Sequence, residues 1–268
     1  MNNLIKRTLT GIIFVTVLFG AIFFHQYTFF VLFLAITVGA INEYFSLIKE
    51  KISPQRCMGS LIAASLFIAA FAHTNYNYNK LYLITLALTF LVFIIELYRK
   101  KERPFDNIAH TITGVIYTGL PFSLINYIVF WGGDTYLPLV LASIFILIWS
   151  NDTFAFLWGV SFGKHKLFER ISPKKSWEGS IGGALSTIAI SYLISRYVTS
   201  IETIDWIIIA IITVISGSLG DLCESLLKRS LNIKDSGNIL PGHGGILDRF
   251  DALLIAIPFI FVYMVFKY

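Results

Sequence analysis

Nine long apolar stretches dominate this 268-residue sequence and predict a chain that crosses a membrane repeatedly. A spanning helix needs about 20 apolar residues, with a range of roughly 17–25, because the hydrocarbon core of a bilayer is about 30 Å thick. Charged residues make up only 14% of the chain, whereas soluble domains carry about 25%. We expect spans at Thr8–Phe24, Tyr27–Ile48, Met58–Ala72, Leu81–Tyr98, Ile108–Phe130, Leu137–Trp158, Ile181–Val198, Ile204–Leu227 and Phe250–Phe266.

The first two stretches are separated only by His25 and Gln26, so a single long helix is an alternative. A helix over Thr8–Ile48 would reach about 60 Å at 1.5 Å per residue, twice the thickness of a bilayer core. Two helices joined by a tight turn are therefore expected. No cluster of small residues resembling a cleavage site follows Phe24, so we interpret the first stretch as part of the structure.

The basic residues give an independent test of this topology, because Lys and Arg are enriched in cytoplasmic loops. With nine spans and a cytoplasmic amino end, all 21 Lys and Arg fall on the cytoplasmic side except Lys80, Arg196 and Lys267. The predicted fold is therefore an all-α, polytopic integral membrane protein. We divide it into N-terminal transmembrane helices (1–135) and a C-terminal region (136–268) that holds two long cytoplasmic loops.

Carboxylates gather where the last two spans meet the final loop. Helical spacing places Asp221 and Glu224 on one face of the eighth span, and Asp248 and Asp251 on one face at the start of the ninth. Carboxylates at a membrane boundary are costly unless they are paired or bind a cation. Oxygen ligands without a Cys/His cluster favour Mg²⁺, whose shell is completed by water and substrate phosphates.

The rest of the final loop suits an anionic substrate. Glycines at 242, 244 and 245 let backbone N–H groups approach an anion, and the start of the last span offers it a positive dipole end. His243 could donate to a phosphate oxygen. The cations of this loop are Lys228, Arg229, Lys234 and Arg249. A purely structural alternative exists for each residue: Asp248 as a helix cap with Asp251 at N3, Glu224 paired with Lys228, and the glycines as a turn.

The loop after the sixth span is the second candidate region. Asn151 and Asp152 lie inside that span and need polar neighbours there. Lys174, Lys175 and Ser176 stand just before the seventh span. The alternative is an ordinary positively charged loop with a helix entry. No P-loop is present, because the spacing of GVSFGKH is too short and no Ser or Thr follows its lysine. Glu43, near the end of the second span, either reaches Lys49 or faces the site.

The final loop resembles the signature of the phosphatidate cytidylyltransferase (CDP-diacylglycerol synthase) family. The match fills every fixed position of that pattern: Ser225, Lys228, Arg229, Lys234, Asp235, Gly237, Pro241, His243, Gly244, Gly245, Asp248, Arg249 and Asp251. The stretches NDTFAFLWG and SPKKSWEG resemble two further blocks of the family, with Ser176 where Thr is frequent. The resemblance covers about Ser150–Asp251; before that it rests on topology and Glu43.

The resemblance implies transfer of CMP from CTP to phosphatidate, giving CDP-diacylglycerol and pyrophosphate with Mg²⁺. It implies a catalytic set of Asp221, Lys228, Arg229, Lys234, Asp235, His243, Asp248, Arg249 and Asp251. The CTP-binding residues would be Asp152, Lys174, Lys175, Ser176, Gly244 and Gly245, and the metal ligands Asp221 and Asp248, with Asp251 and Asp152 as second candidates. Membrane lipids and a second copy of the chain are the expected partners, and nucleic acid is not.

The expected location is a bacterial cytoplasmic membrane, with the active site on the cytoplasmic face, because CTP is cytosolic and phosphatidate lies in the bilayer. Two other classes remain as alternatives. A CTP-dependent lipid-alcohol kinase would release CDP instead of pyrophosphate. A transporter would place ionisable residues near the bilayer midplane and often shows repeated halves, whereas the charges here gather at one face.

Overall fold

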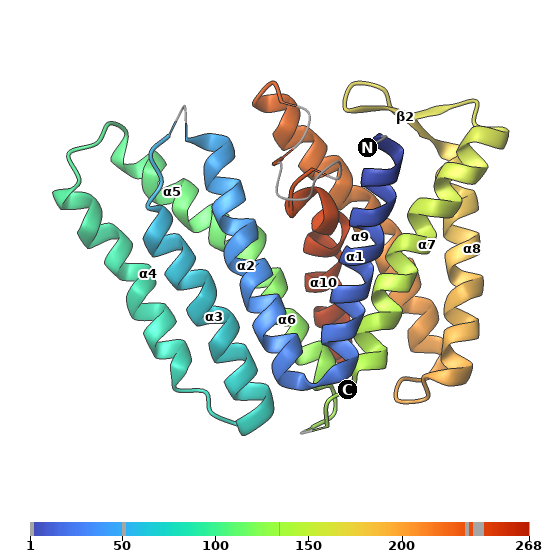
Figure 1. Cartoon of the computed structure of the whole chain (residues 1–268), viewed down its shortest axis with the longest axis horizontal. Coiled ribbons are helices and arrows are strands. Elements are labelled where there is room, and N and C mark those ends of the chain that lie inside the picture. The colour runs from blue at the N-terminus through green and yellow to red at the C-terminus, as the bar shows by residue number, and fades with distance from the viewer. Residues whose placement is uncertain (1–2, 50–51, 134, 234–235, 238–243, 268) are drawn as a thin grey trace. The chain divides into compact units, whose positions relative to one another are not determined.

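The structure, a computed structural model, describes residues 3–49, 52–133, 135–233, 236–237 and 244–267. It is 80% helical, which confirms the predicted class of an all-α protein apart from one short β-hairpin (Figure 1). Within the described residues, seven helices are long and apolar enough to cross a membrane: Gln26–Ile48, Arg56–Tyr76, Leu81–Tyr98, Pro104–Val129, Pro138–Phe162, Thr203–Ser230 and Leu247–Lys267. These seven lie at seven of the nine expected spans. The expected first span is present as a shorter apolar helix, Thr8–Phe24, within a longer helix.

The chain divides into two compact units, which we describe separately. Unit 1 comprises residues 1–137 and 233–250, and unit 2 comprises residues 138–232 and 251–268. The elements of unit 1 are α1 (Asn3–Phe24), α2 (Gln26–Ile48), α3 (Arg56–Tyr76), α4 (Leu81–Tyr98), α5 (Pro104–Gly114), the π-helix η1 (Val115–Gly119) and α6 (Leu120–Val129).

Close helix packing in unit 1 depends on small residues around Phe45 of α2. The Phe45 ring is fully buried. It lies against Gly59 of α3 and Gly114 of α5, where an added Cβ would meet the ring at 2.8 Å or less. Gly119 at the end of η1 lies equally close to Ala63 of α3, with a Cβ-to-Cβ distance of 2.8 Å for an added methyl. Small residues at such contacts let helices associate in a membrane, where there is no hydrophobic driving force between them.

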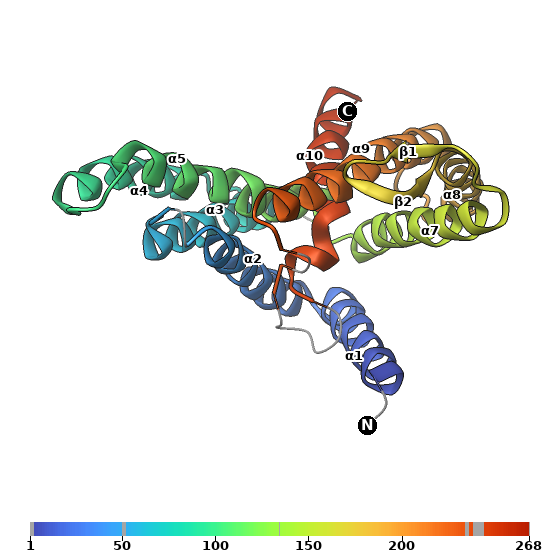
Figure 2. The same cartoon turned by 90° about the horizontal axis from the view of Figure 1, so that it is seen from above.

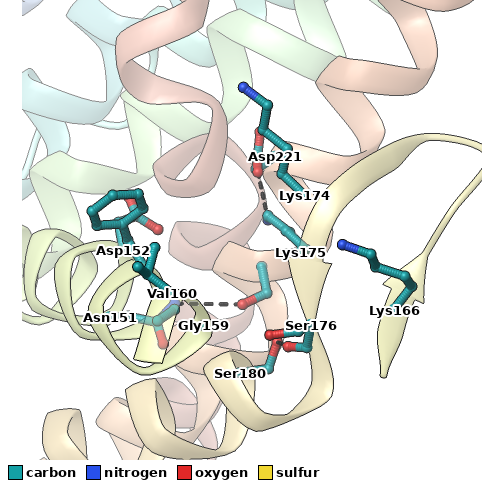
Figure 3. Close-up of a pocket in the computed structure, with 13 residues that line it drawn as sticks. Asn151, Asp152, Gly159, Val160, Lys166, Lys174, Lys175, Ser176, Ser180 and Asp221 are labelled. Atoms are coloured by element: carbon teal, nitrogen blue, oxygen red, sulfur yellow. Dashed lines mark hydrogen bonds and ion pairs between the residues drawn. The ribbon is translucent and has the colours of Figure 1, made fainter. Parts of the chain in front are cut away.

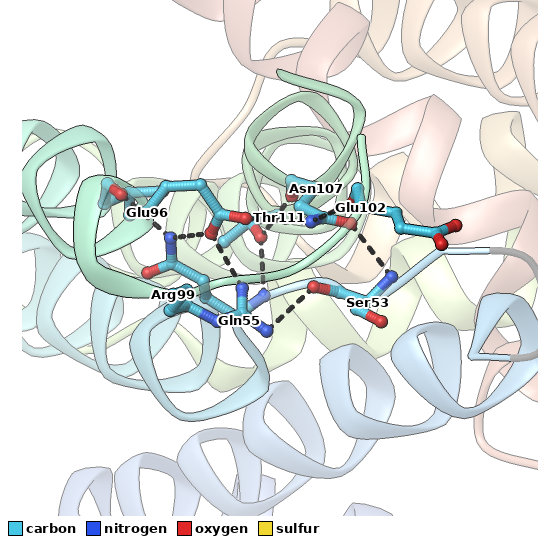
Figure 4. A network of polar contacts seen from close by, with 8 residues as sticks. Ser53, Gln55, Glu96, Arg99, Glu102, Asn107 and Thr111 are labelled. Carbon is cyan, nitrogen blue, oxygen red and sulfur yellow. Dashed lines mark hydrogen bonds and ion pairs between the residues drawn. The ribbon is translucent and has the colours of Figure 1, made fainter. Parts of the chain in front are cut away.

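A buried polar network joins three helices at one end of unit 1 (Figure 4). The Glu96 carboxylate of α4 accepts hydrogen bonds from Arg99 Nη1 at 2.8 Å, Gln55 Nε2 at 2.7 Å and Asn107 Nδ2 at 2.8 Å. The Glu96 side chain is only 2% exposed. Since a buried carboxylate is costly unless it is paired and hydrogen-bonded, this network fixes the start of α3, the end of α4 and the start of α5 together.

Unit 2 contains α7 (Pro138–Phe162), β1 (Lys166–Phe168), β2 (Ser172–Ser176), α8 (Trp177–Tyr197), α9 (Thr203–Ser230) and most of α10 (Leu247–Lys267). The two strands pair antiparallel, with Lys166 opposite Ser176 and Phe168 opposite Ser172. Figures 1 and 2 both place this hairpin at one end of the α7 and α8 pair. The segment between the sixth and seventh expected spans, treated as a loop in the sequence analysis, therefore contains a short antiparallel hairpin over residues 166–176.

The contact between α7 and α8 rests on glycines spaced four residues apart. An added Cβ on Gly179 would lie 2.6 Å from the Ala155 carbonyl oxygen, and one on Gly183 would lie 3.0 Å from the Ala155 Cβ. The indole Nε1 of Trp158 donates to Ser186 Oγ at 3.2 Å across the same contact. This small-xxx-small pattern brings the two backbones together and so places the residues before α8 directly beside α7.

Candidate active site

A cavity of about 500 Å³ opens in unit 2 beside the β-hairpin (Figure 3). Three elements supply its polar side chains: α7, the hairpin with the first turn of α8, and α9. The polar lining residues are Asn151, Asp152, Lys166, Lys174, Lys175, Ser176, Ser180, Ser218 and Asp221. The structure thus brings together Asp152, Lys174, Lys175, Ser176 and Asp221, all of which the sequence singled out.

The electrostatic centre of this cavity is an ion pair between Lys175 and Asp221. Figure 3 shows Lys175 of β2 reaching Asp221 of α9, with the side chains of Lys166 and Lys174 on the same side. The Lys175 and Asp221 side chains keep 28% and 35% of their surface exposed, so an incoming ligand could reach both. Three lysines, Lys166, Lys174 and Lys175, against the two carboxylates of Asp152 and Asp221 leave an excess of positive charge in the cavity, which favours an anionic ligand.

Asn151 supplies a buried polar group at the cavity wall. Its residue is 4% exposed, and its Nδ2 donates to Ser218 Oγ at 3.4 Å. Its Oδ1 has no hydrogen-bond partner among the described residues. Buried acceptors are normally satisfied, so this oxygen is an unusual buried polar atom at the cavity wall.

Ser176 has a structural role in this geometry. It is the N-cap of α8, with extended backbone, and its Oγ accepts a hydrogen bond from Gly179 N at 3.2 Å. Ser, Thr, Asn and Asp are preferred at this position because they satisfy an orphan donor of the first turn. The SPKKSWEG stretch therefore directs its lysines into the cavity through a strand that ends in a helix cap.

Glu178 helps to hold the β-hairpin beside the cavity, and the sequence analysis missed it. Its carboxylate accepts hydrogen bonds from the backbone N–H of Lys164 at 3.0 Å and of His165 at 3.2 Å, and it contacts His165 Nδ1 at 2.6 Å. The hydrogen bond to the His165 side chain, supported by the backbone donors, lowers the pKa of Glu178 to about 2. Glu178 thereby ties the start of the hairpin to α8. The SPKKSWEG stretch contains this residue, but only its lysines and Ser176 were singled out.

A group of three carboxylates lies on the facing sides of α9 and α10. Oxygens of Asp221, Glu224 and Asp251 all lie within 4.8 Å of one another. Gly220 permits this approach, because an added Cβ there would lie 3.1 Å from Ala252 Cα. Glu224 is 1% exposed and forms an ion pair with Lys228 at 2.7 Å. The helical pairing of Glu224 with Lys228, which was the structural alternative for these residues, is therefore present.

An all-oxygen set of three carboxylates has the chemistry of a site for a hard divalent cation such as Mg²⁺. Asp221 belongs both to this group and to the cavity, so the two features share one residue. The group contains Asp221, a first choice of the sequence analysis, and Asp251, a second candidate there, and it adds Glu224 as a possible ligand. Asp248, the other first choice, is not a member of this group.

Asp248 lies in unit 1, where it organises the segment before α10. Its Oδ2 accepts hydrogen bonds from Gly245 N at 2.8 Å, Ser236 N at 3.0 Å and Ser236 Oγ at 2.9 Å. The helix α10 begins at Leu247, three residues earlier than expected, so Asp248 stands inside its first turn instead of capping it. Gly244 has a φ of +83°, and an added Cβ there would collide with Asp248.

Glu43 of α2 occupies the amino end of the same helix. Its carboxylate accepts hydrogen bonds from Ile246 N at 2.8 Å, Leu247 N at 3.0 Å and Ser236 Oγ. Glu43 was expected either to reach Lys49 or to face the site; these contacts place it against the end of the final loop, and its membership of the catalytic site stays a prediction. An added Cβ on Gly245 would collide with this carboxylate. Gly244 and Gly245 therefore allow close approach by carboxylates of the chain itself.

The remaining predicted residues fall into two groups. Arg229 and Arg249 are exposed, on α9 and α10 respectively. Lys234, Asp235 and His243 lie outside the described residues, so their places in the site remain predictions.

The chain belongs to the cytidylyltransferase family, whose sequence profile matches residues 5–267. It is 32% identical over 271 residues to a Bacillus subtilis protein named phosphatidate cytidylyltransferase, and the match covers 97% of each chain. A Staphylococcus epidermidis protein of the same name is 36% identical over 182 residues, which are 67% of this chain and 68% of that one. A Haemophilus influenzae protein of that name is 42% identical over 125 residues, 45% of this chain and 43% of that one. The resemblance drawn from the Ser225–Asp251 pattern is thus confirmed.

Proposed function

We propose that this chain transfers CMP from CTP to phosphatidate, producing CDP-diacylglycerol and pyrophosphate for phospholipid synthesis. The observation that carries the proposal is the match to phosphatidate cytidylyltransferase of Bacillus subtilis along 97% of both chains. The lysine-lined cavity of unit 2 supports it, because a nucleoside triphosphate is polyanionic and needs concentrated positive charge.

The chemistry is an in-line displacement at the α-phosphorus of CTP. A phosphate oxygen of phosphatidate forms the new bond to this phosphorus, the bond to the bridging oxygen of the β-phosphate breaks, and pyrophosphate leaves with that electron pair. The attacking phosphate is ionised near neutral pH, so no strong general base is required. Positioning and charge neutralisation therefore do most of the work, as in other phosphoryl transfers.

Within this proposal, Lys174 and Lys175 hold the phosphates of CTP, Ser176 keeps their strand in place, and Asp152 takes part in CTP binding. Gly244 and Gly245 stay assigned to CTP on sequence grounds. Phe156, an aromatic residue that lines the cavity and is 68% exposed, is available to stack on cytosine. Lipid phosphate or pyrophosphate would be bound by the cations of the final loop, with Asp235 and His243 beside them: Lys228, Arg229, Lys234 and Arg249.

Mg²⁺ is the proposed cofactor, and it would neutralise phosphate charge. The donor set of Asp221, Glu224 and Asp251 fits such an ion. Asp248, chosen on sequence grounds, stays a proposed ligand, although its Oδ2 accepts three hydrogen bonds from Ser236 and Gly245.

We further propose nine spans with a cytoplasmic amino end, a site on the cytoplasmic face of a bacterial cytoplasmic membrane, and a homodimer in contact with membrane lipids. The distribution of Lys and Arg supports this orientation. In this view residues 1–135 are supporting transmembrane helices and residues 136–268 are the catalytic region. Labelling single cysteines placed at Lys80 and at Lys164 in intact cells would test it: the reagent should reach position 80 from outside and should not reach position 164.

Pyrophosphate release by the purified chain in detergent tests the reaction itself. Release that needs CTP, phosphatidate and Mg²⁺ together, with CDP-diacylglycerol formed, is the expected result. CDP formed from CTP and an added polyprenol, without pyrophosphate, would overturn the proposal in favour of a lipid-alcohol kinase. Substrate flux into vesicles without turnover would identify a transporter instead.

A further inference from the structure

A second cavity, of about 490 Å³, lies in unit 1 between the end of α4 and the start of α5. Its walls include Phe93, Ile94 and Leu97 of α4 and Phe105 of α5, and two lysines, Lys100 and Lys101, stand at its end. None of these residues belongs to the proposed catalytic site. The cavity therefore calls for a ligand with an apolar body and an anionic end.

The apolar walls of this groove are open to the surroundings of the protein. Leu97 is 81% exposed, Phe105 75% and Ile94 52%. The exposed stripe continues along α4 through Phe90, Leu86 and Leu83. From Leu83 to Leu97 it spans about 21 Å at 1.5 Å per residue, more than half the thickness of a bilayer core. Only 17% of the apolar window of α4 is buried, the lowest share among the seven described span-capable helices.

The charge at the end of the groove is set by the polar network of Figure 4. Glu96 is neutralised inside the protein by Arg99, whose Nη2 also donates to the Ser53 carbonyl at 3.0 Å. Lys100 and Lys101 are exposed, and neither forms an ion pair with a described residue. The groove therefore has two exposed lysines, Lys100 and Lys101, at the end of its apolar walls. The buried network around Glu96 holds the ends of α4 and α5 that form these walls.

We propose that this groove binds one molecule of an anionic phospholipid, with its phosphate on Lys100 and Lys101 and its acyl chains along Ile94, Leu97 and Phe105. Juxtamembrane lysines attract anionic lipid head groups, and the exposed stripe of α4 provides the apolar surface that acyl chains need. The site differs from the catalytic cavity in unit 2 and stands independently of the proposed reaction.

A second copy of the chain fits the same groove less well. A two-fold contact that packed α4 against its own copy within one membrane would bring both lysine pairs to the same depth. Four like charges would then gather at the contact, which is unfavourable without a counterion. An anionic lipid removes this repulsion and covers the same apolar surface.

Native mass spectrometry of the whole purified chain in detergent tests the proposal. The protein is titrated with phosphatidylglycerol and, separately, with phosphatidylcholine of the same acyl chains. We expect one phosphatidylglycerol to be retained preferentially. Replacing both lysines (K100A/K101A) should weaken its binding about 30-fold, because each lysine near an anionic lipid contributes roughly a factor of five.

Two further variants separate a built groove from general surface charge. Ile94→Trp keeps every cation but fills the groove, and it should reduce retention by a similar factor. K49A/K80A removes the same charge from exposed sites outside the groove and should leave retention unchanged. Equal retention of both lipids by the unaltered chain, unchanged retention in K100A/K101A, or retention of phosphatidate but not phosphatidylglycerol would overturn the proposal.

The same spectra report the oligomeric state. A groove variant that changes the dimer fraction while lipid retention stays constant would show that the face is a protein contact, which would also overturn the proposal. Circular dichroism confirms that each variant is folded, and K100E/K101E, altered only at exposed positions, gives a second reading if Ile94→Trp is unstable.

Discussion

Glu43 and Leu247 are separated by more than 200 residues, yet the Glu43 carboxylate accepts the Leu247 backbone N–H at 3.0 Å. Leu247 is the first residue of α10, and the neighbouring Ile246 N–H donates to the same carboxylate. Glu43 therefore supplies the negative charge and the acceptors that a helix amino end lacks. A side chain in α2 fixes the start of the helix that carries Asp248.

Replacing Glu43 tests whether its hydrogen bonds to Ile246 and Leu247 stabilise the start of α10. Glu43→Ala leaves buried donors without an acceptor, so we expect a loss of about 1–3 kcal/mol in stability. Glu43→Gln retains one acceptor oxygen and should lose less. Thermal unfolding in detergent measures both, with Glu102→Gln, at an exposed position, as the matched control. Unaltered stability in Glu43→Ala would contradict a stabilising role for these hydrogen bonds.

The Lys175–Asp221 ion pair predicts a strong effect on catalysis. Lys175→Ala removes a charge proposed to act on CTP phosphates, and we expect kcat for pyrophosphate release to fall about 10²–10³-fold. Lys49→Ala removes an equal charge from an exposed position outside the cavity and should leave turnover intact. Turnover of Lys175→Ala within twofold of the unaltered protein would rule out this cavity as the nucleotide site.

The carboxylates predict which residues control Mg²⁺ dependence. Asp221→Asn and Asp251→Asn should each raise the Mg²⁺ concentration for half-maximal activity by at least about tenfold, because each removes a ligand charge. Asp248→Asn should do the same if it is also a ligand. A loss of activity in Asp248→Asn with an unchanged Mg²⁺ midpoint would show that Asp248 serves only to hold Ser236 and Gly245.

The close contact at Gly179 predicts that a larger residue there will push α7 and α8 apart and lower the stability of the protein. An added methyl would lie 2.6 Å from the Ala155 carbonyl oxygen, so Gly179→Ala should destabilise the protein by about 1–3 kcal/mol. Gly20 in α1 offers a matched control, since an added Cβ there meets no described atom within 4 Å. Gly20→Ala should be neutral or slightly stabilising. Equal melting temperatures for the two variants would argue against tight packing at Gly179.

Glu178 predicts that the hairpin loosens in acid. The pKa of Glu178 is lowered from 4.5 to about 2, first by its hydrogen bond with His165. A lowered pKa means that the ionised carboxylate stabilises the folded form above pH 4.5 and that this contribution disappears as the pH falls to 2. Amide exchange of residues 163–168 should be slower in the unaltered protein than in Glu178→Gln at pH 5.5, and the difference should vanish near pH 2. A constant difference across this range would contradict the assignment.

Much of the fold followed from apolar length alone. The fourth span was predicted at its observed bounds, Leu81–Tyr98, and the predicted starts of the second and sixth spans differ by one residue from those of α2 and α7. This agreement has a simple cause. In lipid, the backbone N–H and C=O groups of a segment must form hydrogen bonds within the protein, so a long apolar segment folds as a helix. The hairpin over residues 166–176 was missed because strands of three and five residues carry little pattern, and their pairing depends on the ends of α7 and α8.

The candidate site was predictable as a set of residues and not as a set of contacts. The sequence by itself determined the membrane-spanning class, the density of charge in two loops and the family, because hydropathy and the Ser225–Asp251 pattern are local properties. Only the tertiary structure decided that Lys175 pairs with Asp221, that Asp251 of α10 joins Asp221 and Glu224 of α9, and that Glu43 holds the start of α10. Each of these contacts joins two different elements, β2 with α9, α9 with α10, and α2 with α10, and the close packing permitted by Gly179 and Gly220 helps to determine which side chains meet.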